Sequence, residues 1–373
     1  MSDLLYSEIE NDLRASVREV LDDKAPWTSV LAGTEKDEPY DAALWRAVAA
    51  QLGCAGLPVP EDLGGAGATW RETAVVMEEL GRFAAPVPFL SSSVIATAAL
   101  LAAGERDLLA GMASGERIAV LAVPFSTAPG DAGATVRVED GAVTGTVTSV
   151  ADGTAADVFL VPAGDGLYAV DAAGVRRTAV TSLDMTRRLA DIALSGAPAR
   201  RVAEGTGAVR AALLTGAAML ASEQLGLAER CLDDTVAYVK TRYQFGRPVG
   251  SYQGLKHRLA DLWTSVTQAR AVARHAASCV ASSAFAGAAG GPSPRTEAGD
   301  GDTAIAVAVA QAHCSAVALK AAEECVQMHG GIGFTWEHPA HLYLKRAKAD
   351  SIALGTPGHH RAALAALVDL PPA

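Results

Sequence analysis

Two strings in the last third of the chain combine residue types that can bind a phosphorylated ligand. The first, R-x-x-F-G-x-P-x-G-x-x-Q, runs from Arg242 to Gln253, and the second, Q-x-x-G-G-x-G, begins at Gln327. A guanidinium can give a pyrophosphate two parallel hydrogen bonds, amides can donate more, and paired glycines let the backbone approach a ligand closely. The candidate binding residues are therefore Arg242, Phe245, Gln253, Gln327, Gly330 and Gly331.

Each of these residues also has a purely structural interpretation. Arg242 could be a cation that complements the dipole at a helix end, and Gly330 with Gly331 could do no more than cap a helix. For any one residue alone that interpretation would be preferred. The two complete strings at this spacing favour ligand binding instead.

Helical periodicity covers the region that holds both strings. Apolar residues at steps of three or four predict one helix over about 211–243, roughly 50 Å long at 1.5 Å per residue. A second helix has the same rhythm around Leu259 and Leu262, and a third ends before Gly330. A fourth has Pro339 in its first turn, whereas the Gly- and Pro-rich segment from Gly287 to Asp302 is predicted to be a surface loop. We expect an antiparallel four-helix bundle.

Two further regions precede the bundle, so the predicted domains are 1–115, 116–205 and 206–373. In the first, a capping box at Thr69 and Glu72 begins an amphipathic helix, and the preceding GGAGAT is predicted to be a turn and not a phosphate loop. In the second, short Val- and Thr-rich runs alternate with turns, and Glu139-Asp140-Gly141 is predicted to close a hairpin. The predicted fold class is α+β multidomain, with an N-terminal α-helical domain, a small β-barrel or sandwich, and a C-terminal four-helix bundle.

Composition excludes several classes of function. A formal net charge of -11 disfavours binding to nucleic acid or to an anionic membrane. The N-terminus is acidic and the chain has no unbroken apolar stretch of membrane-spanning length, which predicts a cytoplasmic protein. The five cysteines are widely spaced, so we expect buried free thiols and neither disulfides nor a metal site.

The whole pattern resembles the acyl-CoA dehydrogenase family. The strings LGCAGLPVPEDLGGAG and EELGRFAAPVPFL are similar to its opening domain, and RYQFGRPVGSYQ and QMHGGIGF are similar to its two most specific signatures. In that family, tetramers built as pairs of dimers bind FAD across a subunit interface. The flavin ring lies on the β domain of one subunit, and the pyrophosphate and adenosine lie on the C-terminal helices of its neighbour. The resemblance therefore implies that the six candidate residues contact FAD.

The resemblance also implies a catalytic carboxylate, which this chain lacks. Where most members have the glutamate of a Y-E-G-T motif, this sequence reads Ala353-Leu354-Gly355-Thr356. The alternative position used by some members, counted back from the shared GLA, falls on Gly216. Glu223 lies two turns further along and is a weak candidate, more in keeping with a polar contact in a subunit interface.

The β region departs from the family at the flavin ring as well. PFSTAPGDAG from Pro124 replaces T-E-P-x-x-G-S-D, and the string from Thr144 to Asp152 has no aromatic residue where relatives have N-G-x-K-x-W-I-T-N. The half-site for this chain's own flavin thus looks eroded, whereas the half-site that reaches a neighbour's FAD is complete.

The leading hypothesis is a base-lacking subunit of a heteromeric, α2β2 acyl-CoA dehydrogenase that oxidises an acyl-CoA thioester with FAD. The resemblance extends to actinobacterial enzymes of fatty acid or steroid side-chain β-oxidation, and electron-transfer flavoprotein is one candidate electron acceptor. No catalytic residue is assigned.

Three alternatives remain open from the sequence. The chain could be a self-sufficient homotetramer with Glu223 or Asp234 as base, or a non-redox structural subunit. Metal-dependent hydrolysis by His329, His338 and His341 is disfavoured, because HPAH straddles a helix start and no carboxylate lies at ligand spacing. His359 and His360 are expected at a solvated helix start.

Overall fold

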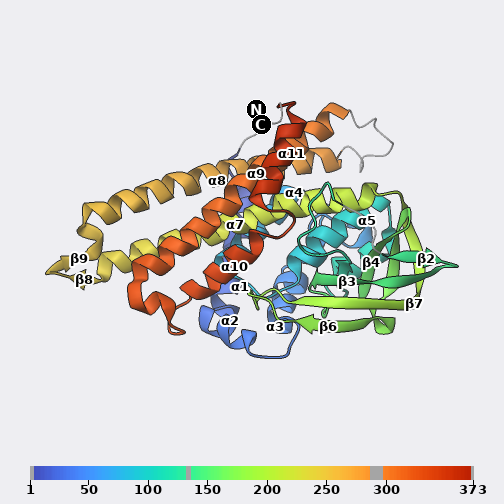
Figure 1. Cartoon of the computed structure of the whole chain (residues 1–373), viewed down its shortest axis with the longest axis horizontal. Coiled ribbons are helices and arrows are strands. Elements are labelled where there is room, and N and C mark those ends of the chain that lie inside the picture. Colours follow the sequence, from blue (N-terminus) through green and yellow to red (C-terminus); the bar gives the residue numbers. More distant parts are fainter. Residues whose placement is uncertain (1–3, 132–135, 286–296, 371–373) are drawn as a thin grey trace.

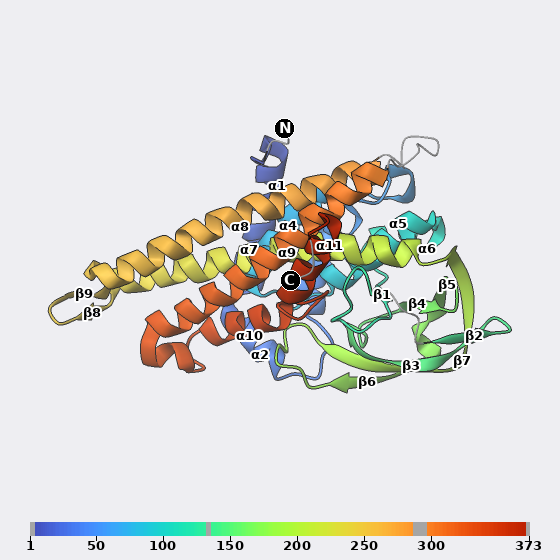
Figure 2. The ribbon, with the colours of Figure 1, turned by 45° about the horizontal axis from the view of Figure 1, so that its top comes forward.

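The computed structural model describes residues 4–131, 136–285 and 297–370. Helices come first, a β-sheet domain follows, and long helices complete the chain (Figure 1), so the predicted order of regions is confirmed. The β domain lies at one end of the molecule and the tip of the long helices at the other, and the turned view in Figure 2 shows the same arrangement.

The N-terminal region contains six α-helices and two π-helical turns among its described residues. The capping box at Thr69 and Glu72 is present and begins α4, and GGAGAT before it forms a turn, as predicted. The helices are α1 (Glu8–Lys24), α2 (Trp27–Thr34), α3 (Ala42–Trp45), α4 (Trp70–Phe83), α5 (Thr97–Ala103) and α6 (Arg106–Ala113), with π-helical η1 (Arg46–Gln51) and η4 (Phe89–Ala96).

The β domain is one sheet in the order β1-β4-β5-β7-β3-β2, and β6 pairs with β7 outside that path. Its longest strand, β7, has 16 residues and pairs with β5, β3 and β6. Asp140 and Gly141 have φ angles of 48° and 75°, which confirms the predicted hairpin between β2 and β3. The strands are β1 (Ala119–Leu121), β2 (Arg137–Glu139), β3 (Ala142–Ala151), β4 (Val158–Ala163), β5 (Gly166–Asp171), β6 (Arg176–Val180) and β7 (Leu189–Glu204).

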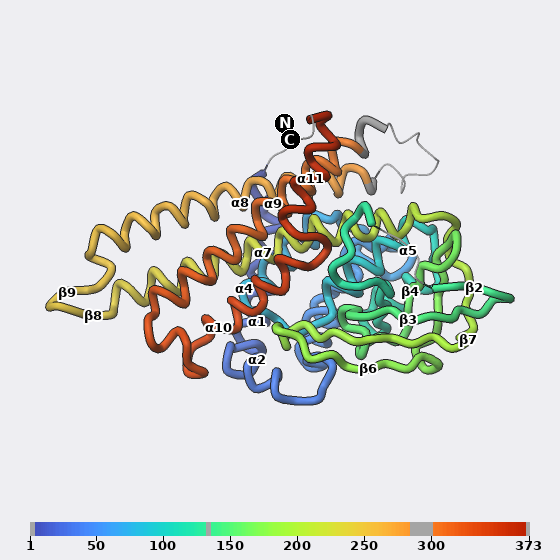
Figure 3. Tube along the Cα trace, viewed as in Figure 1, coloured from blue at the N-terminus to red at the C-terminus, as the bar shows by residue number. Residues whose placement is uncertain are grey.

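The C-terminal region is built on the helices α7 (Gly207–Thr241), α8 (Gln253–Phe285) and α9 (Glu297–His329). The shorter α10 (Ala340–Asp350) and α11 (Pro357–Leu367) pack against α9. A small hairpin of β8 (Tyr243–Gln244) and β9 (Arg247–Pro248) joins α7 to α8 at the tip, and the tube in Figure 3 follows this path.

The predicted loop from Gly287 to Asp302 is wrong in its last part. Residues 297–302 are already helical, because α9 begins at Glu297, after the two prolines of the segment. The remainder of that prediction lies outside the described residues.

The long apolar helices and most of the cysteines lie in the core of the protein. Although α7 and α9 are long and apolar enough to cross a membrane, most of each apolar window is buried inside the protein, so both are core helices. The five cysteines are free, as predicted, and all are buried except Cys279, which is half-buried.

Two glycines allow α4 and α7 to cross in close contact. A Cβ added at Gly226 would lie 1.8 Å from the carbonyl oxygen of Glu78, and one at Gly81 would lie 2.1 Å from that of Glu223. These atoms belong to helical backbone, so the helices themselves would have to separate. The contact fixes the N-terminal helices against the bundle.

Replacing Gly226 with alanine should therefore destabilise the protein. Overpacking against rigid backbone costs about 3 kcal/mol, which corresponds to a fall of roughly 5 °C or more in the midpoint of thermal unfolding. Gly301→Ala is the matched control, because a Cβ at Gly301 of α9 meets nothing within 4 Å. An unchanged midpoint for Gly226→Ala would show that the helices can separate at little cost.

Candidate functional site

The two sequence strings meet at the tip of the long helices. Tyr238 near the end of α7 donates a hydrogen bond from its hydroxyl to the carbonyl oxygen of His329, 3.3 Å away, and the two rings stack with centroids 4.3 Å apart. Val239, Val249 and Met328 form a small apolar cluster beside them. The packing therefore joins the α7–α8 hairpin to the end of α9.

All six candidate binding residues are exposed at this tip. Arg242 caps α7, Phe245 lies in the hairpin with 91% of its surface exposed, and Gln253 begins α8. Gln327 is in the last turn of α9, and the two glycines open the 3-10 turn η7 (Gly330–Phe334) that follows. The structure thus brings together the residues that the sequence selected, although their predicted contacts with FAD are not tested by this arrangement.

The donor groups of the tip have no internal partners. Among the described residues, the side chains of Arg242, Gln253 and Gln327 form no hydrogen bond or ion pair. A Cβ at Gly331 would meet nothing within 4 Å, whereas one at Gly333 would lie 2.6 Å from the carbonyl oxygen of Val326. Packing explains Gly333 but not Gly331. The set fits a ligand that needs amide and guanidinium donors beside bare backbone, as a dinucleotide pyrophosphate does.

The α7–α8 segment of the tip is positively charged. The segment 235–260 holds five Lys and Arg residues and no Asp or Glu, in a chain whose net charge is -11. Arg258 pairs with Glu324, but none of the other four forms an ion pair with a described residue. Those four are Lys240, Arg242, Arg247 and Lys256.

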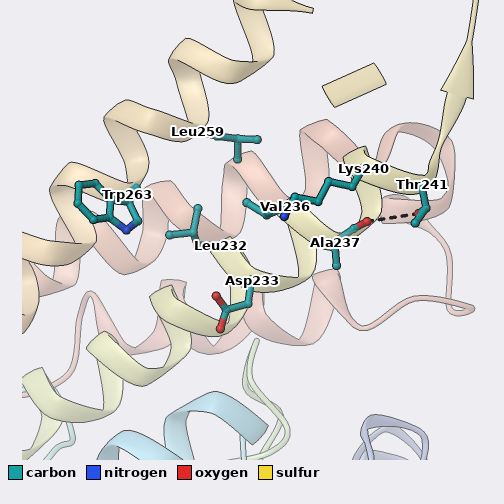
Figure 4. A pocket seen from close by; sticks show the side chains of 8 residues that line it. All are labelled: Leu232, Asp233, Val236, Ala237, Lys240, Thr241, Leu259 and Trp263. Atoms are coloured by element: carbon teal, nitrogen blue, oxygen red, sulfur yellow. Dashed lines mark hydrogen bonds between the residues drawn. The ribbon is translucent and has the colours of Figure 1, made fainter. Parts of the chain in front are cut away.

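A groove also lies between α7 and α8 on the side of the bundle. It has a volume of about 560 Å³ and is mostly apolar, with Trp263 at one end and Lys240 and Thr241 at the other (Figure 4). The lining residues are Leu232, Asp233, Val236, Ala237, Lys240, Thr241, Leu259 and Trp263. None of the six candidate binding residues lines this groove.

Leu354 and Gly216, the two positions where the family's catalytic base was expected, lie together at a second place, far from the tip. A Cβ added at Gly216 of α7 would lie 3.2 Å from Cδ1 of Leu354 and 2.8 Å from Cγ1 of Ile95. The Leu354 side chain is 1% exposed. Apolar side chains thus fill the space at both positions.

The backbone at Leu354 is unusual for a leucine. Its φ angle is 52°, in the left-handed region that branched apolar residues seldom adopt. Two hydrogen bonds hold it there: its N–H donates to the carbonyl oxygen of Phe125 (2.8 Å), and its own carbonyl oxygen lies 2.9 Å from Nε2 of His360. The prediction of a solvated His360 is wrong, because the ring is 3% exposed and burial lowers its pKa.

A very small cavity lies beside Leu354. Its volume is about 20 Å³, close to the minimum that holds one water molecule. Apolar side chains dominate the lining, which consists of Ser91, Ile95, Val120, Leu121, Val123, Phe125, Ala151, Leu213 and Leu354. An acyl chain does not fit in this space.

Glu223 is neither a free base nor a subunit contact, so both expectations for it are wrong. It is 1% exposed and accepts hydrogen bonds from Nη2 of Arg187 (2.6 Å) and Nη1 of Arg346 (2.5 Å). Burial alone would raise its pKa, but the charges of the two arginines hold the pKa of Glu223 below its ordinary value. The second candidate, Asp234, pairs with Arg230 one turn away on α7.

The same arginines reach two more buried carboxylates that the sequence analysis missed. Nη1 of Arg187 donates to Asp350 (2.8 Å), and Nε of Arg346 donates to Asp184 (2.6 Å). Burial, followed by the charge of Glu223, raises the pKa of Asp350 to about 8. One local signal was available, since Arg346, Asp350 and Leu354 follow one another at steps of four.

The raised pKa of Asp350 predicts a specific pH dependence. Between about pH 4 and pH 8, Asp350 is ionised in the unfolded chain but still protonated in the folded one. The free energy of unfolding therefore falls as pH rises through that interval. Asp350→Asn should remove this dependence on pH, because asparagine does not titrate. Oδ2 of Asp350 accepts no hydrogen bond among the described residues, so the amide nitrogen can replace that atom. The thermal midpoint should then fall less between about pH 6 and about pH 9 than in the wild type. Asp261→Asn, at an exposed position of α8, is the control, and equal slopes for all three proteins would refute the assignment.

Comparisons with known proteins agree with this architecture. The model of the acyl-CoA dehydrogenase C-terminal domain matches residues 203–368, and that of the N-terminal domain matches residues 7–116. Acyl-CoA dehydrogenase IpdE2 of Mycolicibacterium smegmatis is 36% identical over 94% of this chain and 96% of its own length. Acyl-CoA dehydrogenase FadE27 of Mycobacterium tuberculosis is 34% identical over 86% of each chain.

Solved structures match over the whole length. A chain of the ChsE4-ChsE5 complex from Mycobacterium tuberculosis superposes with a TM-score of 0.85 at 29% identity, covering 100% of both chains. A variant of the Tcur3481-Tcur3483 steroid ACAD gives a TM-score of 0.81 at 29% identity, covering 97% of this chain and 98% of that one. Butyryl-CoA dehydrogenase of Megasphaera elsdenii has a TM-score of 0.83 at 20% identity, over 98% of this chain and 100% of that one, a likeness of fold alone.

Proposed function

Because the chain belongs to the acyl-CoA dehydrogenase family, whose members are FAD-dependent oxidoreductases acting on CH–CH donors, we propose that it is the base-lacking subunit of a heteromeric enzyme. Its role is to complete the FAD site of a partner chain that carries the catalytic glutamate. The proposal rests on a contrast between two places in this chain, the space around Leu354 and Gly216 and the tip of the long helices. The space at Leu354 and Gly216 is closed by apolar side chains, while the tip presents unpartnered donors.

The family's reaction needs a carboxylate within hydrogen-bond reach of the proton next to the thioester carbonyl. Leucine and glycine cannot accept that proton, and Glu223 is held by two arginines. The cavity of about 20 Å³ beside Leu354 leaves no place for the acyl group. In this chain the same closed space therefore blocks both the binding of the acyl group and the abstraction of its proton.

At the tip, this chain's residues bind and orient the cofactor of the partner. Arg242 offers a bidentate guanidinium to the pyrophosphate, Gln253 and Gln327 donate amide hydrogens, and the backbone at Gly330 and Gly331 admits close approach. Phe245 would supply an aromatic ring beside the cofactor. FAD, when bound, supplies the hydride acceptor of the reaction.

The substrate class follows from the relatives. The Tcur3481-Tcur3483 protein is a steroid ACAD, and both it and the ChsE4-ChsE5 complex are assemblies of two different chains. We infer that this chain forms an α2β2 tetramer with a second family member and acts on a bulky acyl-CoA such as a steroid side-chain thioester. Each pair of chains then has one closed acyl pocket, in this chain, and one open acyl pocket, in its partner. The closed pocket leaves room for a bulky substrate beside the open one.

Co-expression tests the proposal directly. Produced alone, the chain should be colourless and inactive. Produced with a glutamate-bearing acyl-CoA dehydrogenase chain of the same organism, it should form a complex that holds one FAD per pair of chains and oxidises acyl-CoA. Arg242→Ala in the complex should lower FAD retention by about tenfold or more, the effect of losing a bidentate ionic contact. Arg210→Ala, exposed at the other end of α7, is the matched control. A yellow, active homo-oligomer of this chain alone would overturn the proposal.

A self-sufficient enzyme is the second candidate, and one residue favours it. Asp152 follows Ala151, which lines the small cavity, burial raises the pKa of Asp152 to about 6, and a carboxylate with that pKa suits a general base. However, it is 3% exposed and accepts a hydrogen bond from the hydroxyl of Ser91 at 2.5 Å, which favours a structural role.

The variant Asp152→Asn separates the two candidates. Asparagine keeps the acceptor for Ser91 but cannot take a proton, so turnover by the complex should stay within about twofold of the wild type if Asp152 is structural. A general base contributes about a hundredfold or more to the rate. A loss of that size at constant KM and constant FAD content would identify Asp152 as the base.

A further inference from the structure

Two histidines bring together the ends of the exposed segment that carries Gly330 and Gly331. His329 is the last residue of α9, His338 lies two residues before α10, and their rings stack with centroids 4.1 Å apart. Most of the residues between them, 330–337, are exposed, and the tube in Figure 3 passes through this segment from α9 to α10. We call 330–337 the glycine loop. The two imidazoles hold its ends against each other.

Helix α7 supplies a third ring to this contact. Tyr238 stacks on His329 with ring centroids 4.3 Å apart, and its hydroxyl donates a hydrogen bond to the carbonyl oxygen of the same residue. One face of an imidazole has room for a single ring at this distance, so Tyr238 and His338 take opposite faces. Nδ1 of His329 donates to the carbonyl oxygen of Cys325 at 2.7 Å, which fixes the rotation of the ring. We call these three side chains the ring stack.

The ring stack connects the two strings that supply the candidate binding residues. Tyr238 lies four residues before Arg242, about 6 Å along the axis of α7. His329 lies two residues after Gln327 and directly before the glycine loop. Aromatic pairs prefer defined relative orientations, so the stacking orients the two strings as well as attracting them. The placement of the glycine loop relative to Arg242 therefore depends on this contact.

His338 has a second contact that does not involve the face of its ring. Its Nδ1 accepts a hydrogen bond from the N–H of Ala340, the first residue of α10, at 3.2 Å. The bond satisfies one of the free N–H groups at the start of that helix. Burial, followed by the charge of His329, lowers the pKa of His338 to about 4, in keeping with an unprotonated Nδ1. Substitution can separate the two contacts, because phenylalanine keeps only the ring and asparagine keeps only the acceptor.

We propose that His338 is a positioning residue of the cofactor site, which through the ring stack holds the glycine loop in a fixed place relative to Arg242. This inference rests on the function proposed above and adds a residue that neither string contains. His338 is not one of the six candidate contacts, and its effect on FAD is exerted through His329. The contacts all lie within one chain, so their geometry can be tested without flavin and without a partner.

Proteolysis of the full chain produced alone tests the ring stack in the absence of cofactor. Chymotrypsin cuts after large aromatic residues and needs a locally opened segment, and Phe334 of the glycine loop is 75% exposed. His338→Asn should speed cleavage after Phe334 about threefold to tenfold, the effect of losing one aromatic pair. His338→Phe should stay within about twofold of the wild type. Cleavage after Phe245, in the β8–β9 hairpin, is the internal control and should not change.

The co-expressed complex tests the effect on the cofactor. Flavin is removed, and the dissociation constant for added FAD is measured together with the thermal midpoint of the flavin-free complex. His338→Asn should weaken FAD binding about threefold to tenfold, and His338→Phe should bind FAD within about twofold of the wild type. His359→Ala, in α11 and outside the tip, is the control for loss of a histidine and should leave FAD binding unchanged.

The opposite results overturn the inference. If His338→Phe loses FAD and His338→Asn does not, the hydrogen bond to Ala340 matters and the ring stack does not. If both variants lower FAD affinity and the thermal midpoint together, the role of His338 is only structural. Equal cleavage after Phe334 in all three proteins would show that the stack does not hold the loop.

Failure of this inference can be told apart from failure of the proposed function. If the wild-type complex binds FAD and both variants of His338 bind it equally well, the inference is wrong and the proposed function stands. If the wild-type complex binds no FAD, the proposed function fails, and the role of His338 in FAD binding fails with it. Cleavage after Phe334 in the chain alone then still decides whether the ring stack holds the glycine loop.

Discussion

Two arginines buried between three parts of the chain determine how those parts fit together. Arg187 precedes β7 and Arg346 lies in α10, and both bind Glu223 in the middle of α7. Arg346 also approaches the carbonyl oxygen of Ala85 just after α4, at 3.5 Å. Burying such charges costs several kcal/mol per ion and is offset only when nearly every donor and acceptor is used, as it is here. The β domain, the N-terminal helices and the bundle therefore have one relative arrangement.

The same ion network engages the carboxylates buried beside α7. Glu223 is fully engaged, and Asp350 keeps its proton to about pH 8 because burial and Glu223 disfavour its charge. From Asp350 the chain turns directly into Leu354, whose left-handed backbone is fixed by Phe125 and His360. A leucine in that conformation is strained, and the surrounding hydrogen bonds compensate. The turn is thus rigid, closed and apolar.

Features that depend on local chemistry were predictable from the sequence. The capping box at Thr69, the hairpin at Asp140 and the glycine that ends α9 each act over a few residues, and all three are present. The antiparallel order of the helices explains why the two strings meet at the tip, although the sequence analysis did not predict that meeting. The six tip residues could be chosen because their types and spacing are distinctive, although their contacts with a cofactor remain predictions.

Features that depend on distant partners could not be predicted. Arg187 and Glu223 are 36 residues apart, and Arg187 and Asp350 are 163 apart, so no spacing rule connects them. Burial of His360 was missed for the same reason, since a helix start with two histidines is usually solvated and only the carbonyl of Leu354 makes this one different. The sequence located the two positions where the family's base was expected, whereas only the packing revealed that apolar side chains fill the space at both.

The length of α7 ties these observations to the need for a second chain. Gly216 and Arg242 lie on this one helix, 26 residues and roughly 39 Å apart. That span is longer than a dinucleotide can bridge, so one cofactor cannot touch both the closed cavity and the tip of the same chain. Donors at the tip can serve a flavin only if another polypeptide brings its ring to them. The role proposed for this chain in FAD chemistry, with its own cavity filled and its tip open, therefore requires an assembly.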